Sequence, residues 1–350
     1  MMQVLIVGSG LLGTSLGLAL RQAGHEVWLA DRLSEHVELA RKLGAGQPVA
    51  ASAEPQVVIV AVPPSQFRKV VDEYGRRYVN ATFTDVSSIK TQPLADVESI
   101  QGVHGRFVGG HPMAGRETSG PAGARADLFV DRLWILTPTE EVPEARLEEV
   151  RGLAEDCGSV VRIMTPEAHD RAVALTSHTP QVVASVMAGL IARAPVDDIQ
   201  LSGQGLRDLT RIAGSSPELW DDILTANADE VDVVLAAFEA QLSAVRSALR
   251  AGASVREMLH VGNAGRARIP AKHGGPARTE DAVLSVSVDD RPGALARLFA
   301  AAADANISIE DVRIDHMLGR ENAVVDLSVR AEVAPVLREL LIAGGWKVRS

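Results

Sequence analysis

The sequence predicts an α/β chain in three parts: a doubly wound parallel sheet, an all-helical region and a small βαββαβ module. Strand-like and helix-like runs alternate over the first 165 residues, and long helical patterns with few strand signals follow to about residue 262. A second set of short strands begins near residue 281. Alternation of strands and helices is typical of a parallel sheet covered on both faces. We therefore expect domains at residues 1–165, 166–262 and 281–350, joined by a linker at residues 263–280.

The strands expected in the first part are short, and the one at residues 3–7 is a continuous apolar run, as in a strand buried on both faces of a sheet. They are expected at residues 3–7, 26–30, 57–62, 82–86, 133–137 and 160–163, with a helix at residues 11–23 after the first strand. This order of strand, helix and strand indicates a Rossmann-type domain.

The middle part carries apolar residues at helical spacing, and several of its expected helices are apolar on more than one face. Two such sets are Val182, Val183, Val186, Met187 and Leu190, and Val231, Val234, Leu235, Phe238 and Leu242. We expect these helices to be buried against a second copy of the chain, which would make the protein a homodimer. The linker that follows is rich in Gly, Pro and basic residues, whose charges are either solvated or folded back over an anionic site.

Composition excludes several classes of function. The net charge of −10 argues against nucleic acid or an anionic membrane as a partner. The single cysteine, Cys157, cannot form an intrachain disulfide, and no apolar run is long enough to span a membrane. Because the N-terminus carries no basic leader, we expect a cytoplasmic protein. The spacing of Cys and His residues suggests no metal site.

A glycine-rich turn follows the first strand and opens the first helix. Gly8, Ser9, Gly10, Leu11, Leu12 and Gly13 fit the pattern G-x-G-x-x-G, which binds a dinucleotide diphosphate at a helix N-terminus. Asp31, at the end of the next strand, can accept hydrogen bonds from both adenosine ribose hydroxyls, which favours NAD over NADP. Arg32 beside it could instead hold a phosphate or stack on adenine. Val62 and Pro63 complete the expected cofactor site.

The segment from Gly109 to Gly120 reads GGHPMAGRETSG and is too rich in Gly and Pro for an ordinary helix. It contains His111 and Glu117. We expect a loop with a constrained backbone path, and ionisable groups on such loops often carry chemistry. Because the segment lies downstream of the expected cofactor site, we expect His111 to face a redox cofactor.

This segment resembles the signature loop of prephenate dehydrogenases, the oxidoreductases of tyrosine biosynthesis. Three further segments resemble motifs of that family: Thr84-Asp85-Val86-Ser87-Ser88-Ile89-Lys90, Ser177-His178-Thr179-Pro180-Gln181 preceded by His169-Asp170, and Gly205-Leu206-Arg207-Asp208-Leu209-Thr210-Arg211-Ile212-Ala213. Ser87, Thr179 and Gln181 depart from the family pattern. The resemblance covers residues 1 to about 260, and it implies NAD-dependent oxidative decarboxylation of prephenate to 4-hydroxyphenylpyruvate.

The resemblance also implies which residues act on the reacting centre. His111 would accept the proton of the C4 hydroxyl while a hydride leaves C4 for the nicotinamide. Ser88 would form a hydrogen bond that orients the site, and it could contact the same hydroxyl. His178 would line the pocket near the nicotinamide or the substrate.

A second set of residues would bind the two carboxylates of the substrate. Arg211 would hold the ring carboxylate through a bidentate fork, and Asp208, three residues earlier, would set its position. Glu117 would guard the pocket or join an ionic network. Arg116 and Gln181 are weaker candidates for the side-chain carboxylate.

The C-terminal part is expected to form strands at residues 282–288, 307–314, 323–329 and 346–348, with helices at 295–305 and 333–343 and a turn at 319–322. This order, the sequence DRPGALARL and the pair Asn306-Ile307 resemble the ACT fold, a ferredoxin-like module that binds amino acids. The resemblance implies an amino-acid effector, tyrosine above all, at an interface between paired modules. Its contacts would be Asp290, Arg291, Pro292, Gly293, Asn306 and Ile307.

Two alternatives remain at this point. Arogenate carries an ammonium where prephenate has a ketone, and a pocket for it would be expected to place a carboxylate there. Gln181 is neutral, which favours prephenate. The other alternative is a non-catalytic amino-acid sensor of the ACT type on a Rossmann scaffold, which would be expected to lack His111 or Arg211, and both are present.

Overall fold

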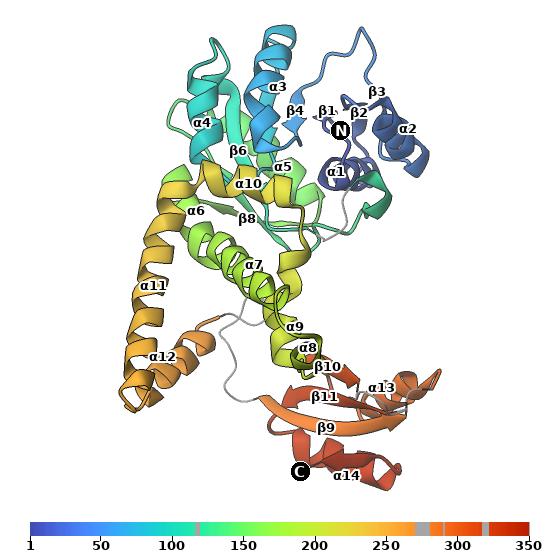
Figure 1. Ribbon diagram of the computed structural model, residues 1–350. Helices are drawn as coiled ribbons and strands as arrows, with labels where there is room; N and C mark the ends of the chain where they lie inside the picture. The colour runs from blue at the N-terminus through green and yellow to red at the C-terminus, as the bar shows by residue number, and fades with distance from the viewer. Residues whose placement is uncertain (116–119, 270–280, 290, 317–321, 350) are drawn as a thin grey trace. The chain divides into compact units, whose positions relative to one another are not determined.

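The computed structural model describes residues 1–115, 120–269, 281–289, 291–316 and 322–349. It divides the chain into two compact units, Met1–Ala244 and Val245–Ser350 (Figure 1). Four of the sequence predictions lie wholly or partly outside the described residues. They are the segment with Arg116 and Glu117, most of the expected linker, the effector contact Asp290, and the turn at residues 319–322.

The first unit is built on an eight-stranded sheet with the strand order β3-β2-β1-β4-β5-β6-β7-β8. The strands are β1 Gln3–Val7, β2 Glu26–Ala30, β3 Gln47–Pro48, β4 Val57–Val60, β5 Thr82–Asp85, β6 Phe107–Pro112, β7 Leu133–Thr137 and β8 Val160–Ile163. The order reverses between β1 and β4, and ligands of such sheets bind at the carboxyl ends of the strands beside this reversal. The predicted Rossmann-type domain is confirmed.

Helices cover both faces of this sheet because successive strand residues point to opposite sides. Val4 and Ile6 of β1 share one core with α1 Leu11–Gln22, α2 Ser34–Leu43 and α5 Glu144–Asp156. Leu5 and Val7 share the other core with α3 Pro64–Arg77 and α4 Thr91–Glu98 (Figure 1). Both faces of the strand are therefore apolar, which explains its continuous apolar sequence.

Two expectations for this sheet are wrong. The sheet is not wholly parallel, because β7 runs antiparallel to β6. An antiparallel neighbour needs no helical crossover, and the described part of the connection between the two strands holds only the short 3₁₀ turn Pro121–Gly123. His111 lies in β6 and not in a loop.

The two glycines before His111 explain why this Gly-rich stretch forms a strand. A Cβ atom on Gly110 would lie 2.6 Å from the backbone oxygen of Asp85, and one on Gly109 would lie 2.3 Å from Oγ1 of Thr137. Strand β6 is fully buried between β5 and β7, so these positions have no room for a side chain. The glycines permit close packing of the strands. The sequence pattern had instead predicted a loop at these residues.

The rest of the first unit is helical, as predicted. Its elements are α6 Pro166–Val173, a π-helical turn Ala174–His178, α7 Thr179–Ile191, α8 Val196–Gln200, α9 Gln204–Thr210, a 3₁₀ turn Arg211–Gly214, α10 Pro217–Ala226 and α11 Ala228–Arg250, which continues into the second unit. Thr165 and Ser216 cap the starts of α6 and α10 through their hydroxyl oxygens. Helix α10 is joined to α3 where Ser65 Oγ donates to Asp222 Oδ2 at 2.6 Å.

Large apolar side chains remain exposed on these helices. They include Val186 and Leu190 on α7 and Val233, Phe238 and Leu242 on α11. The helical spacing of Val186, Leu190, Phe238 and Leu242 was predicted, whereas Val233 was not in the predicted sets. A single copy of the chain leaves all five uncovered. No helix within the described residues is long and apolar enough to cross a membrane.

The second unit contains α12 Arg256–Ala267 and a small module in the predicted order βαββαβ. Helix α12 continues five residues beyond the end expected at residue 262. The module consists of β9 Asp281–Asp289, α13 Ala294–Asp304, β10 Asp311–His316, β11 Asn322–Arg330, α14 Ala334–Ala343 and β12 Lys347–Arg349. Its antiparallel sheet has the order β10-β11-β9-β12. Leu298 of α13 and Leu337 and Leu341 of α14 pack on Val286 and Val325 of the sheet.

Candidate active site

The glycine-rich turn has the geometry that its pattern predicts. Gly8 has a positive φ of 105°, and a Cβ atom there would lie 2.2 Å from the backbone oxygen of Ala61. A Cβ atom on Gly13 would lie 1.8 Å from the oxygen of Gly8, so α1 can pack against the turn only because Gly13 has no side chain. Nothing lies within 4 Å of the corresponding position on Gly10, so a ligand can approach the backbone there.

The residues around this turn suit a dinucleotide. No side chain caps the N-terminus of α1, so its first N–H groups keep their capacity for an anion. Asp31 accepts from the backbone N–H of Ser9 at 2.6 Å and of Leu33 at 2.9 Å. These bonds hold the carboxylate at the end of β2, and each oxygen retains a lone pair for a ribose hydroxyl. Arg32, the next residue, and Pro63, after the end of β4, are exposed.

The predicted cofactor residues thus meet at the carboxyl edge of the sheet. Leu11, Leu12 and Val62 are half-buried there, and Ser9 is buried with an Oγ atom that has no hydrogen-bond partner. Strand β6 is parallel to its neighbour β5, so His111, near the carboxyl end of β6, lies at the same edge. The topology therefore brings the cofactor residues and His111 to one side of the sheet.

His111 is the first member of a buried chain of three side chains. Its Nδ1 lies 2.8 Å from Nε2 of His169, whose Nδ1 lies 2.7 Å from Oδ1 of Asp170. Asp170 also accepts from the backbone N–H groups of Lys90 and Thr91, each at 2.8 Å, at the start of α4. Strand β6 and helix α6 are thereby joined through the histidine that was expected to carry the chemistry.

The pKa values of these hydrogen-bonded side chains favour a neutral His111 beside an ionised Asp170. Burial, and then the nearby His169, Lys90 and His178, lower the pKa of His111 well below its usual 6.5. For Asp170, burial acts to raise the pKa, but hydrogen bonds from His169 and Thr91 outweigh it and the pKa is lowered. His111 is therefore an uncharged imidazole at neutral pH.

A buried ion pair lies behind His111. Nζ of Lys90 is 2.5 Å from Oδ2 of Asp85, and both side chains are fully buried. The same Nζ donates to the backbone oxygen of Gly110 at 2.6 Å, while Oδ1 of Asp85 accepts from the Gly110 N–H at 2.8 Å. Ser87 Oγ also donates to Asp85. Both backbone groups of the residue before His111 are thus held by one ion pair.

His178, at the end of the π-helical turn, is held by residues of the helical region. Asn227 Nδ2 lies 3.0 Å from Nδ1 of His178 and donates to the backbone oxygen of Asp170 at 3.0 Å. The ring of Trp220 meets the His178 ring edge-on, with centroids 6.0 Å apart. Burial lowers the pKa of His178 to about 4, although the nearby Asp170 opposes this shift. His178 is therefore also neutral.

Several polar atoms around these histidines are buried without a hydrogen-bond partner. They are Oγ of Ser88, Nε2 of His178, Oγ1 of Thr179 and Oε1 of Gln181. A buried polar atom without a partner costs free energy, and native proteins usually satisfy such atoms with a protein group, a water or a ligand. Three of the four belong to residues that the sequence analysis assigned to the site.

The other predicted substrate residues lie on neighbouring elements. Asp208, on α9, accepts from Gln204 at 2.9 Å. Arg211 is exposed and begins the 3₁₀ turn that follows α9, so the two residues are not on one continuous α-helix as expected. This turn and α9 both pack against α7, the helix that carries Gln181.

Sequence reasoning missed five residues that build the site: Asp85, Lys90, His169, Asp170 and Asn227. Four of them stand in the motifs quoted above, which was the available signal. Asn227 lies just before α11 and carried no pattern of its own. Among the described residues, no group of three or more His, Cys, Asp and Glu side chains could hold a metal ion.

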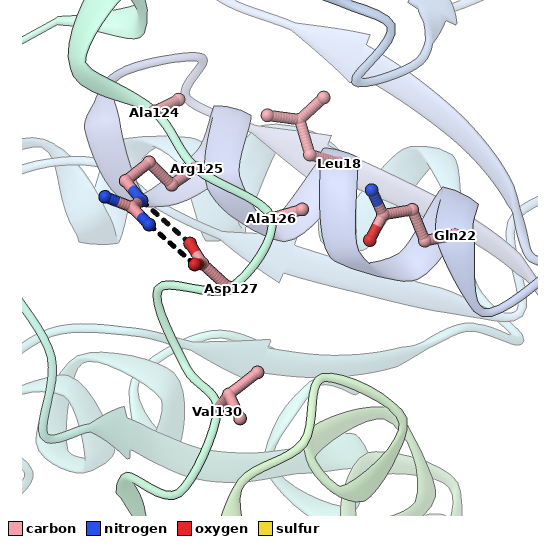
Figure 2. Close-up of a pocket in the computed structure, with 7 residues that line it drawn as sticks. All are labelled: Leu18, Gln22, Ala124, Arg125, Ala126, Asp127 and Val130. Atoms are coloured by element: carbon pink, nitrogen blue, oxygen red, sulfur yellow. Dashed lines mark hydrogen bonds and ion pairs between the residues drawn. The ribbon is translucent and has the colours of Figure 1, made fainter. Parts of the chain in front are cut away.

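A separate hollow of about 510 Å³ lies on the surface beside α1. It is lined by Leu18, Gln22, Ala124, Arg125, Ala126, Asp127 and Val130. Figure 2 shows the Arg125 guanidinium donating two hydrogen bonds to Asp127, at 2.8 and 2.6 Å. The hollow contains none of the residues predicted to bind cofactor or substrate.

Comparison with known proteins was made for both sequence and structure. A family model described as "Prephenate dehydrogenase, nucleotide-binding domain" matches residues 16–163, and one described as "Prephenate dehydrogenase, dimerization domain" matches residues 165–260. The chain is 31% identical to a probable prephenate dehydrogenase of Streptomyces niveus, with 100% of both chains covered.

Two of the similar solved structures each cover 76% of this chain. Prephenate dehydrogenase from A. aeolicus, in complex with hydroxyphenyl propionate and NAD⁺, is 32% identical, with a TM-score of 0.69 and 97% of that chain covered. Arogenate dehydrogenase from Synechocystis is 27% identical, with a TM-score of 0.63 and 99% of that chain covered.

The ion pair behind His111 can be tested by removing its cation. Lys90→Met should lower the free energy of unfolding by about 3–5 kcal/mol, because Asp85 would remain buried without a positive partner. Urea unfolding followed by circular dichroism measures the loss. Lys42→Met, at an exposed lysine, should change stability by less than about 0.5 kcal/mol. A loss below about 1 kcal/mol for Lys90→Met would show that the pair does not stabilise this edge.

Proposed function

The chain belongs to the prephenate dehydrogenase family, and we propose that it catalyses oxidative decarboxylation of prephenate to 4-hydroxyphenylpyruvate with NAD⁺. The observation that carries the proposal is a neutral, buried His111 at the sheet edge where the dinucleotide turn lies. Prephenate loses a hydride from C4, a proton from the C4 hydroxyl and CO₂ from the ring. The site must therefore supply a proton acceptor and residues that bind carboxylate groups.

The residues of the glycine-rich turn would hold NAD. The diphosphate would lie over Gly10 at the start of α1, and Asp31 would accept from the ribose hydroxyls. When bound, the nicotinamide supplies the hydride acceptor. A 2′-phosphate would meet the carboxylate of Asp31 at close range, which supports NAD over NADP.

His111 would accept the proton of the C4 hydroxyl. A histidine must be neutral to act as a base, and burial keeps His111 in that form. The unpartnered Oγ of Ser88 and Nε2 of His178 would be satisfied by polar groups of the substrate. Removal of the proton from the C4 hydroxyl raises electron density at the carbinol oxygen, which favours departure of the hydride from C4.

The substrate carboxylates would be held from the helical region. We assign the ring carboxylate to Arg211, because a guanidinium can form two parallel hydrogen bonds with it, and Asp208 to the positioning of that arginine. Glu117, which would guard the pocket or join an ionic network, lies outside the described residues.

Gln181 bears on the choice between prephenate and arogenate. Its side chain is buried and uncharged, which favours the ketone of prephenate over an ammonium group. Its Oε1, however, is an acceptor without a partner, and the ammonium of arogenate could donate to it. Arogenate is therefore the second candidate substrate.

A homodimer would cover the exposed apolar residues of α7 and α11. Val186, Leu190, Val233, Phe238 and Leu242 lie within residues 165–260, the match to the dimerization-domain model. Their exposure in one copy of the chain supports this proposal.

The C-terminal module is proposed to bind an amino-acid effector, as an ACT fold would. Arg291, Pro292 and Gly293 precede α13, whereas Asn306 and Ile307 follow it. An 11-residue helix is about 16 Å long, so one small ligand cannot contact both sets in one module. A paired module would have to supply the second set. Asp290, the sixth predicted contact, lies outside the described residues.

The substrate is tested by steady-state reduction of NAD⁺ at 340 nm with each compound. We expect kcat/KM for prephenate to exceed that for arogenate by at least about tenfold, because Gln181 offers no negative charge to an ammonium. NADP⁺ should support a lower rate than NAD⁺. A preference for arogenate would overturn the assignment of substrate but not of family.

His111→Asn tests the base. We expect kcat to fall by about 10²–10⁴-fold with KM for prephenate little changed. In the unaltered protein, kcat/KM should hold steady as pH falls through 6.5 and decline only well below it, because the lowered pKa delays protonation of His111. Near-normal turnover by His111→Asn, or an acid limb at or above pH 6.5, would contradict the assignment.

The effector is tested by titrating tyrosine, phenylalanine and tryptophan into the full chain in a calorimeter. Binding of tyrosine should be lost on Gly293→Val, because Gly293 has a positive φ of 82° that valine adopts only with strain. The rate with prephenate in the absence of tyrosine should stay unchanged. No heat with any of the three amino acids would count against the proposed regulation.

A further inference from the structure

The hydrogen bonds that link His111, His169 and Asp170 run in a fixed donor-to-acceptor order, because only certain placements of the ring protons allow both bonds. We propose that His169 and Asp170 are positioning residues that hold His111 in the tautomer with a proton on Nδ1 and a bare Nε2. The proposal rests on the role of His111 as proton acceptor. It adds which ring nitrogen acts and what fixes that choice.

The chain begins at Asp170, whose carboxylate can only accept. It receives the backbone N–H groups of Lys90 and Thr91 at 2.8 Å each, and the N-terminus of α4 favours a negative charge there. Nδ1 of His169 is 2.7 Å from the same carboxylate. His169 must therefore carry a proton on Nδ1 to make this bond.

The second step sets His111. A neutral imidazole with a proton on Nδ1 has a bare Nε2. Nε2 of His169 is 2.8 Å from Nδ1 of His111, so it accepts a hydrogen bond from the N–H at that atom. His111 then has a bare Nε2 that can take the hydroxyl proton. A second proton, on Nε2 of His169, would reverse this order: His169 would donate to Nδ1 of His111, whose own proton would then be on Nε2.

Asp170 also sets His178, through its backbone. Its carbonyl oxygen accepts from Asn227, which assigns the atom at that position as the amide nitrogen. The same nitrogen lies 3.0 Å from Nδ1 of His178 and donates to it, so the proton of His178 is on Nε2. This Nε2 is buried and has no hydrogen-bond partner. The two histidines are therefore held in opposite forms, His111 as an acceptor and His178 as a donor.

The arrangement serves the proton transfer without moving a second proton. The O–H bond of the C4 hydroxyl breaks and an N–H bond forms at Nε2 of His111, whose ring becomes positive. The Nδ1–H of that ring already donates to His169, which in turn donates to the Asp170 carboxylate. The charge formed on His111 is thus stabilised by a hydrogen-bonded chain that ends in an anion.

Two substitutions at His169 separate polarity from packing. In His169→Gln the side-chain amide can donate to Asp170 and accept from His111, whereas His169→Leu can do neither. We expect His169→Leu to lower kcat by about 10²–10³-fold with KM for prephenate within about threefold, and His169→Gln to recover at least tenfold of that loss. His260→Leu, at an exposed histidine of α12, is the matched control and should leave the rate unchanged.

The kinetic results show whether His169 positions His111 through hydrogen bonds or only fills space in the core. If His169→Leu turned over prephenate at the normal rate, or better than His169→Gln, the polar chain would have no role and the proposal would fail. Melting temperatures of all variants report on folding. If His169→Leu does not fold, the comparison between His169→Gln and the unaltered protein in the next experiment still decides.

Nitrogen-15 NMR of the histidine rings reads the tautomers directly, with no substrate present. We expect a proton on Nδ1 of His111 and on Nε2 of His178, and the same form of His111 in His169→Gln. His111→Asn and His178→Asn identify the two sets of signals. A proton on Nε2 of His111 would overturn the inference even if NAD⁺ reduction by prephenate were normal. Failure to reduce NAD⁺ with the expected tautomers in place would instead overturn the proposed function.

Discussion

The buried ion pair between Lys90 and Asp85 is the interaction on which the geometry of the site depends. It joins the end of β5 to β6 by holding both backbone groups of Gly110, the residue before His111. A buried charge is unfavourable unless it is paired and hydrogen-bonded, and here each charged group also contacts a backbone atom of β6. The pair therefore sets the position of the strand, and the strand sets the direction of the imidazole.

The absence of side chains at two positions is as necessary as the charges. Gly109 and Gly110 leave space for Thr137, for the side chain of Lys90 and for the backbone of Asp85. The same principle operates at the cofactor turn, where Gly8 and Gly13 permit close contact between β1, β4 and α1. In both places the backbone approaches its neighbours more closely than any Cβ atom would allow. Packing at the sheet edge thus positions both halves of the site.

Asp170 links the Rossmann-type domain to the helical region. Its carboxylate caps α4 and orients His169, while its carbonyl oxygen holds Asn227 beside His178. The base from the sheet and the histidine from the helices thereby share one anchoring residue. This explains why the short pair His169-Asp170 accompanies the better-marked motifs of the chain.

Local sequence determined the cofactor turn, six of the eight strands of the first sheet, and the βαββαβ order of the C-terminal module. These features depend on steric limits and on apolar periodicity, which are properties of neighbouring residues. Only the tertiary structure decided that His111 lies in a strand, that β7 runs antiparallel to β6, and that His111 meets a residue 58 positions away. Contacts of this kind arise when separate elements pack together, and the spacing of residues within one segment holds no information about which side chain of another segment will face it.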